Sequence, residues 1–181
     1  MRGNQTVKAT LEAINSMEAD GVIGKYAIGG AVGATLYLEP AATLDVDIFV
    51  TLPTAPHGSL LLSLAPLYDY LKARGGTVRD EHIVIGGWPV QFLPPSNELE
   101  REAVAGSVLT TVEGVTTRVM SAEHLVAIAL CTGRSKDHIR ILQFIEQDAV
   151  DRGKLQSILE RHGLTPKWKQ FEQKYLEGIH E

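Results

Sequence analysis

The stretch Tyr26–Val50, YAIGGAVGATLYLEPAATLDVDIFV, combines a glycine pair with two closely spaced carboxylates, and the fold is interpreted from it. Its first three residues form a short apolar run that is typical of a buried strand. Gly29 and Gly30 follow at once, and residues 31–38 are mostly good helix formers before a Glu-Pro pair that ends a helix. We therefore predict a strand, a tight glycine turn and a helix in succession.

A second strand is predicted at Thr43–Thr51, and it carries Asp45 and Asp47 among apolar neighbours. Residues two apart in a strand point to the same face, so the two carboxylates stand side by side. Such a pair resists desolvation and needs a proton, a basic partner or a divalent cation. Magnesium binds through one or two carboxylates together with substrate phosphates, so we predict that Asp45 and Asp47 are magnesium ligands.

The glycine pair has two interpretations. Gly29 and Gly30 permit positive φ and let a ligand approach the backbone, and the helix that follows offers free amide groups to an anion. Alternatively, the two glycines only make a sharp turn and allow the helix to pack closely. The dipeptide taken alone favours the second interpretation.

Composition indicates a soluble globular protein with one substantial core. The chain has 181 residues, of which 44% are apolar and 22% charged, and its net charge is −5. This acidic balance does not indicate a nucleic-acid-binding protein. No apolar run approaches the ~20 residues of a membrane span, and the first residues lack the apolar core of a secretory signal. We expect a cytoplasmic protein without a membrane segment.

Cys131 is the only cysteine, which excludes an internal disulfide and any metal site with several cysteines. Free cysteine is among the most buried residue types, so we expect Cys131 to be a small residue of the protein core, carried on a helix.

The rest of the chain is predicted to alternate helices and strands and then to become helical. We expect an α/β (α+β) domain over residues 1–119 and a helical region over residues 120–181 that packs on it. The expected helices are Thr6–Ala19, Ser59–Arg74, an exposed Asn97–Ala105, His124–Cys131, Asp137–Glu146, Asp151–Arg161 and Pro166–Leu176. The expected further strands are His82–Ile85 and Trp88–Leu93, joined by a tight Gly-Gly turn, and Val112–Val119, with Gly114 in a turn.

Strand, Gly-Gly, helix and a strand with Asp-x-Asp, in that order, resemble the nucleotidyltransferase superfamily with its polymerase-beta-like fold. The resemblance implies a mixed sheet flanked by helices. It also implies that Gly29, Gly30 and Thr43 contact the nucleotide, and that Asp45 and Asp47 bind magnesium for catalysis.

A second segment, Ser121–Ile141, SAEHLVAIALCTGRSKDHIRI, is similar to abortive-infection toxin-like nucleotidyltransferases. In these proteins a leucine-rich helix precedes an Arg-x-Lys-Asp stretch, which Arg134, Lys136 and Asp137 match. The resemblance implies that Arg134 and Lys136 bind the nucleotide and that Lys136 takes part in catalysis. The alternative is that these residues only form the solvated face of a helix start.

Two residues depart from the pattern of the superfamily. Its active members usually carry a third carboxylate on a later strand, where this chain has Gln91, and an amide cannot accept a proton at neutral pH. Arg140 stands where an aspartate would be usual. The sequence therefore supports binding of a triphosphate better than it supports transfer of the nucleotidyl group.

The function expected from the resemblance is magnesium-dependent transfer of a nucleotidyl group from a nucleoside triphosphate to a hydroxyl of RNA, protein or a small molecule. A toxin-like role with an antitoxin partner would fit the second segment. The alternative is a non-catalytic module of the same fold that binds a nucleotide or a protein partner, and Gln91 motivates it.

Overall fold

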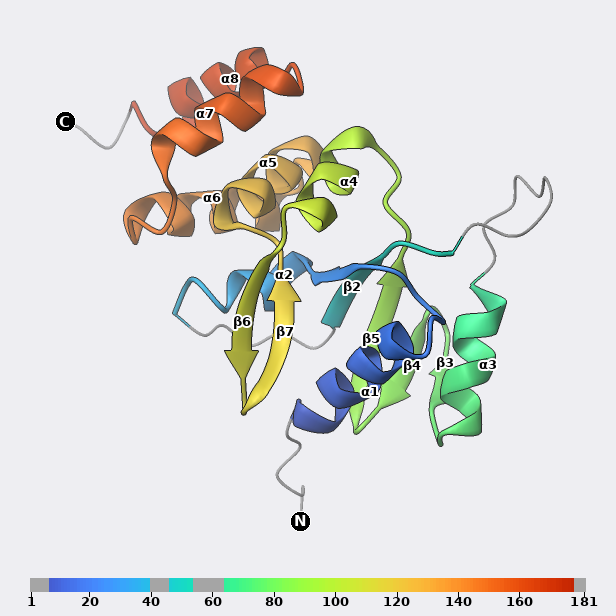
Figure 1. The fold of residues 1–181 in the computed structure, drawn as a ribbon. Helices are drawn as coiled ribbons and strands as arrows, with labels where there is room; N and C mark the ends of the chain where they lie inside the picture. The colour runs from blue at the N-terminus through green and yellow to red at the C-terminus, as the bar shows by residue number, and fades with distance from the viewer. Residues whose placement is uncertain (1–6, 40–45, 54–63, 178–181) are drawn as a thin grey trace.

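The computed structural model describes residues 7–39, 46–53 and 64–177, and its centre is one seven-stranded mixed sheet between helices (Figure 1). The strand order is β3-β4-β5-β2-β1-β7-β6. Pairing is parallel between β2 and β5 and between β1 and β7, and antiparallel elsewhere. The strands are β1 (Tyr26–Ile28), β2 (Val46–Val50), β3 (Thr77–Arg79), β4 (His82–Ile85), β5 (Trp88–Leu93), β6 (Val108–Val112) and β7 (Val115–Val119).

Eight helices are described, and they divide between the two faces of the sheet. Helices α1 and α3 lie on one side, while α4 to α8 lie on the other, with α7 and α8 outermost (Figure 1). Their bounds are α1 (Lys8–Ala19), α2 (Gly30–Ala34), α3 (Ala65–Ala73), α4 (Glu98–Ala105), α5 (Ala122–Thr132), α6 (Ser135–Glu146), α7 (Arg152–Arg161) and α8 (Thr165–Tyr175). None of the described helices is long and apolar enough to cross a membrane.

Each face of the sheet has its own apolar core, and β2 shows how the sequence separates them. Ile48 packs with α1 and α3, whereas Phe49 packs with α4, α5 and α6. This follows from the two-residue period of a strand. Asp47 shares the parity of Phe49, so its side chain points towards α4–α8. The core on that side includes residues of the sheet and of residues 120–181 together.

The predicted α/β class and mixed sheet are confirmed, although β3 was not predicted and two predicted elements differ from the structure. The helix expected over residues 31–38 is regular only at Gly30–Ala34. Residue 33 is a glycine that lies against the carbonyl of Ile28, and glycine weakens a helix interior. The strand expected at Val112–Val119 is divided at the expected turn: Glu113 and Gly114 adopt positive φ, and β7 pairs back along β6, which was not predicted.

Two expectations about burial were wrong. The helix expected to be exposed, now α4, buries Leu99, Ala103 and Val104 against α5 and the sheet. Glu98 and Arg101 are exposed, whereas Glu100 and Glu102 are partly buried. Cys131 is exposed in the last turn of α5, next to an exposed Thr132, and does not belong to the core.

Candidate functional site

The glycine turn brings β1 and α2 against the acidic strand. The amide of Gly29 donates to the carbonyl of Asp47 at 2.9 Å, which extends the pairing of β1 with β2 into the turn. Gly30 has φ of 56°, and a Cβ there would collide with the carboxylate of Asp47. The positive φ predicted for this turn is therefore confirmed at Gly30, and only glycine leaves room for the Asp47 side chain.

Asp47 lines a cavity of about 220 Å³, which we call the Asp47 cavity. The sheet and the glycine turn form one wall, and the helices α4, α5 and α6 form the other. The residues that line it are Gly30, Asp47, Phe49, Gln91, Leu93, Glu100, Met120, Leu125, Ile128, Ala129, Thr132, Arg134, Asp137 and Arg140. The lining thus combines carboxylates and guanidinium groups with apolar side chains.

The cations of the cavity come from the start of α6. Gly133 ends α5 with φ of 66°, and Arg134 follows it as the N-cap of α6. The carboxylate of Asp137 accepts from Nε of Arg134 at 2.7 Å and from Nη2 at 3.2 Å. Arg140 contacts the same carboxylate from the next turn at 3.5 Å. One buried aspartate therefore holds two arginines at the cavity wall.

The charges of Asp137 and Asp47 both affect the arginines at the start of α6. Burial raises the pKa of Asp137, but the hydrogen bonds from Arg134 and the charge of Arg140 outweigh it and hold the pKa below its ordinary value. The pKa of Arg134 is raised by its hydrogen bond with Asp137, and the charge of Asp47 adds to this. The charged form of Arg134 is therefore stabilised both by Asp137 of its own helix and by Asp47 of β2.

Gln91, for which the superfamily resemblance predicted a carboxylate, lies beside Asp47. It is the direct partner of Asp47 in the parallel pairing of β2 with β5, and it lines the same cavity. Two other acids also line the cavity. Asp137 is held by arginines, and Glu100 accepts from the backbone and hydroxyl of Ser96 at 2.6 and 2.8 Å. Neither is an uncommitted base.

The structure gathers some of the predicted site residues and leaves others apart. Gly30, Asp47 and Arg134 line the cavity together. Lys136 is exposed on α6 and does not line it. Asp45 and Thr43, predicted for metal and nucleotide, lie outside the described residues.

A magnesium ion fits the described donors only in part. Asp47 offers a carboxylate at a cavity whose arginines would suit phosphate oxygens, and magnesium keeps few protein ligands. Among the described residues, no group of three or more histidine, cysteine, aspartate or glutamate side chains could hold a metal. Asp45, the predicted second ligand, is not among the described residues.

Sequence reasoning missed several cavity residues. Arg140 was noted only as a departure from the family pattern, although its spacing of three from Asp137 was a signal that both lie on one helical face. Glu100, Phe49 and Met120 had no local signal, because separate elements bring them to the cavity.

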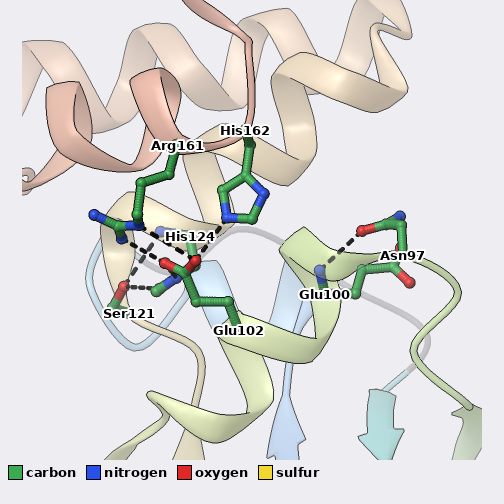
Figure 2. A network of polar contacts seen from close by, with 7 residues as sticks. All are labelled: Asn97, Glu100, Glu102, Ser121, His124, Arg161 and His162. Carbon is green, nitrogen blue, oxygen red and sulfur yellow. Dashed lines mark hydrogen bonds and ion pairs between the residues drawn. The ribbon is translucent and has the colours of Figure 1, made fainter.

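A second cluster of charged side chains lies away from the cavity and joins three helices (Figure 2). Glu102 of α4 accepts from Nη2 of Arg161 at 2.5 Å and from Nε2 of His162 at 2.6 Å. Nε2 of His124 lies 3.1 Å from the same carboxylate. We call these four residues the Glu102 network.

The tautomer of His124 follows from its partners. A carboxylate can only accept, so Nε2 of His124 carries the proton, and Nδ1 accepts from the hydroxyl of Ser121 at 2.7 Å. The same hydroxyl accepts from the amide of His124 at 3.2 Å and caps α5. Ser121 is therefore an N-cap whose hydroxyl bonds both the amide and the ring of His124. Arg161 above all lowers the pKa of Glu102, to about 2.

Solved structures share this architecture, whereas no protein-family model and no curated protein sequence matches the chain. An antigenic nucleotidyltransferase-like protein from Paracoccidioides brasiliensis matches with a TM-score of 0.55 and 16% identity, over 92% of this chain and 93% of that one. This chain has a nucleotidyltransferase-like fold. The antibiotic-resistance factor ANT(2'')-Ia matches with a TM-score of 0.51 and 14% identity, over 94% of this chain and 98% of that one.

At these identities the likeness concerns the fold, and the reaction must be argued from the residues. Both matches extend over more than nine-tenths of this chain. The narrower similarity to abortive-infection toxin-like proteins remains a prediction.

Proposed function

We propose that the chain binds a nucleoside triphosphate in the Asp47 cavity and transfers its nucleotidyl group to a hydroxyl acceptor. The observation that carries this proposal is that Asp47, Gly30 and Arg134 line one cavity. A carboxylate on a strand, a side-chain-free turn and a fixed guanidinium group are the parts that a metal-bound triphosphate needs.

Each residue has a role that its chemistry supports. Arg134 and Arg140 would neutralise phosphate oxygens, since guanidinium groups bind them bidentately. Gly29 and Gly30 would let the phosphates approach the backbone. A volume of about 220 Å³ is smaller than most complete ligand pockets, so the phosphates would occupy it and the nucleoside would extend outside.

Asp47, with Asp45 as the predicted second ligand, would hold magnesium beside these phosphates. When bound, the ion would neutralise charge on the phosphates and orient them for in-line displacement. Thr43 and Lys136 keep their predicted roles as contacts of the nucleotide. Since Lys136 is exposed outside the cavity, it would act on a part of the substrate that projects from it.

A second candidate function is nucleotide binding without transfer, and the position of Gln91 favours it. Gln91 is paired with Asp47 where a general base would be expected, and Asp137 and Glu100 are committed to other contacts. In that case the chain would respond to a nucleotide or regulate a partner, including an antitoxin, rather than modify RNA, protein or a small molecule.

Calorimetry with each of the four common ribonucleoside triphosphates in excess magnesium tests binding. We expect the wild type to bind at least one of them and Asp47→Ala to lose about tenfold or more in affinity. Asp69→Ala, which removes an exposed acid of α3, is the matched control and should bind as the wild type does. Failure of the wild type to bind any triphosphate would contradict both candidate functions.

A transfer assay with α-labelled nucleotide then separates the two candidates. Label that appears on an acceptor and is absent with Asp47→Ala supports transfer. Binding by calorimetry without label transfer, across RNA, protein and small-molecule acceptors, supports the non-catalytic module.

A further inference from the structure

The two edges of the sheet are protected to different degrees. Edge strands expose backbone donors and acceptors, and proteins usually shield them with charge, proline or a short length. At one edge, β3 has only three residues and includes Arg79. At the other edge, β6 has the sequence VLTTV, with five residues and neither charge nor proline (Figure 1).

The side chains of β6 also leave apolar surface uncovered. Val108 is 46% exposed and Leu109 is 64% exposed, two of the few large apolar residues that the described chain exposes. Valine has a high strand propensity, and both side chains present apolar area that a neighbouring strand would cover.

The hairpin determines which backbone groups of β6 face outwards. Val112 and Val115 flank a two-residue turn and pair directly. In such a hairpin this pair exchanges both hydrogen bonds, and the bonded pairs alternate along the strands. Residues 108, 110 and 112 therefore direct their backbone groups to β7, while Leu109 and Thr111 direct theirs away from the sheet.

We propose that β6 is a self-association surface, on which β6 of a second copy pairs antiparallel about Thr110 and extends the sheet across both molecules. A two-fold axis at Thr110 sets Leu109 opposite Thr111 of the second copy. Both residues have outward backbone groups, so this register completes their hydrogen bonds. It also sets Val108 opposite Val112 of the second copy.

Charge complementarity supports a second copy as the occupant. The register brings Glu113 of the second copy alongside Ser107, between Gly106 and Val108. Those two residues line a cavity of about 500 Å³ together with Lys154, Arg161 and Glu123.

Lys154 is the cation available to Glu113 of the second copy. Arg161 is engaged by Glu102 and Glu123 by the amide of Asp151, whereas no described residue forms an ion pair with Lys154. In the single copy, Glu113 accepts a hydrogen bond from the backbone amide of Lys8 at 2.9 Å, and in the dimer it would exchange this contact for Lys154 of the other copy.

Pairing through one short strand buries little area, so the dimer should be weak and depend on concentration. Sedimentation equilibrium of the full chain from about 1 to 200 µM should show a reversible monomer–dimer equilibrium. A chain that stays monomeric over this range would overturn the proposal.

Thr111→Pro tests the strand edge. It removes an outward amide while leaving the pairing with β7, and proline is tolerated at such an edge position. We expect it to be monomeric throughout, with an unchanged circular dichroism spectrum. Thr111→Val keeps the amide and should dimerise as the wild type does. A dimer that survives Thr111→Pro in folded protein would overturn the proposal.

A charge exchange tests the register without altering the backbone. Lys154→Glu should weaken the dimer by about two- to fivefold, Glu113→Lys by a similar factor, and the double variant should restore it. Lys169→Glu, on the exposed face of α8, makes the same change in net charge and should have no effect. Equal dimerisation of all these variants would overturn the Thr110-centred register.

Discussion

The Asp47 cavity and the Glu102 network are both built from carboxylates, arginines and other polar side chains, but they connect the fold differently. In the Glu102 network, Arg161, His162 and His124 converge on one carboxylate and tie α7 and α5 to α4. In the cavity, Asp137 holds Arg134 and Arg140 within a single helix. The Glu102 network joins helices, whereas Asp137 positions two cations along the lining of the Asp47 cavity.

This difference indicates which charges hold the fold and which can serve a ligand. A carboxylate that bridges helices contributes to stability when they fold together, and its loss leaves several donors unpaired. An arginine fixed by its own helix remains oriented towards the cavity with little effect on the packing of other elements. Substitutions in the two clusters should therefore separate binding from stability.

The largest effect is expected for Arg134→Ala. It should lower affinity for the magnesium complex of a triphosphate by about 10- to 100-fold, since hydrogen bonds to charged groups contribute about 1.5–3 kcal/mol. The midpoint of urea unfolding should fall only modestly, because the buried Asp137 loses two hydrogen bonds but keeps the backbone amide of residue 134 and Arg140 as donors. Calorimetry measures the affinity, and Arg152→Ala on the exposed start of α7 is the control. Equal affinities for variant and wild type would remove Arg134 from the site.

A smaller effect, on stability alone, is expected for Glu102→Ala. It should lower the free energy of unfolding at neutral pH by about 1–2 kcal/mol, because Arg161, His162 and His124 lose a shared acceptor that is partly exposed. Urea unfolding measures this, and nucleotide affinity should not change. Glu98→Ala removes a more exposed acid of the same helix and should have a smaller effect.

Acid should remove the same contribution. The pKa of Glu102 is lowered from 4.5 to about 2, so its contribution is complete at neutral pH and is lost as the pH falls from about 4.5 to 2. The difference between wild type and Glu102→Ala should narrow across that interval. A difference that stays constant down to pH 2 would show that the carboxylate is not stabilised by its cationic neighbours.

The smallest effect is expected for Lys136→Ala. The residue is exposed and does not line the cavity, and exposed charges are screened by salt, so affinity should fall by less than about twofold. The measurement is the calorimetric titration used for Arg134→Ala, in the same buffer. A loss as large as that of Arg134→Ala would restore Lys136 to the centre of the site and weaken the contrast between the two clusters.

Local patterns predicted much of the fold. Alternation in β2, the glycine pair before α2 and the Gly-Gly hairpin between β4 and β5 each follow from backbone preferences within a few residues. The same patterns predicted Asp47 facing away from Ile48, and Arg134 and Asp137 at one helix start. These features depend on residues close in sequence, so periodicity and turn chemistry suffice.

The rest depended on contacts between distant segments. Glu102 meets residues 22, 59 and 60 positions later, and no local period encodes such a meeting. A turn at Gly114 was expected, but the hairpin of β6 and β7 around it was not, because Glu113 also adopts a positive φ, which is uncommon outside glycine. Glu100 reaches the cavity only because α4 folds over the sheet.

Gly133 constrains where the cavity can place its cations. It is the C-cap of α5 with φ of 66°, and Arg134, the N-cap of α6, follows it directly. A residue with a side chain would be strained in this conformation, so glycine at this position sets the direction in which α6 leaves α5. The placement of Arg134 beside Asp47 therefore depends on the backbone of one residue as well as on the two side chains.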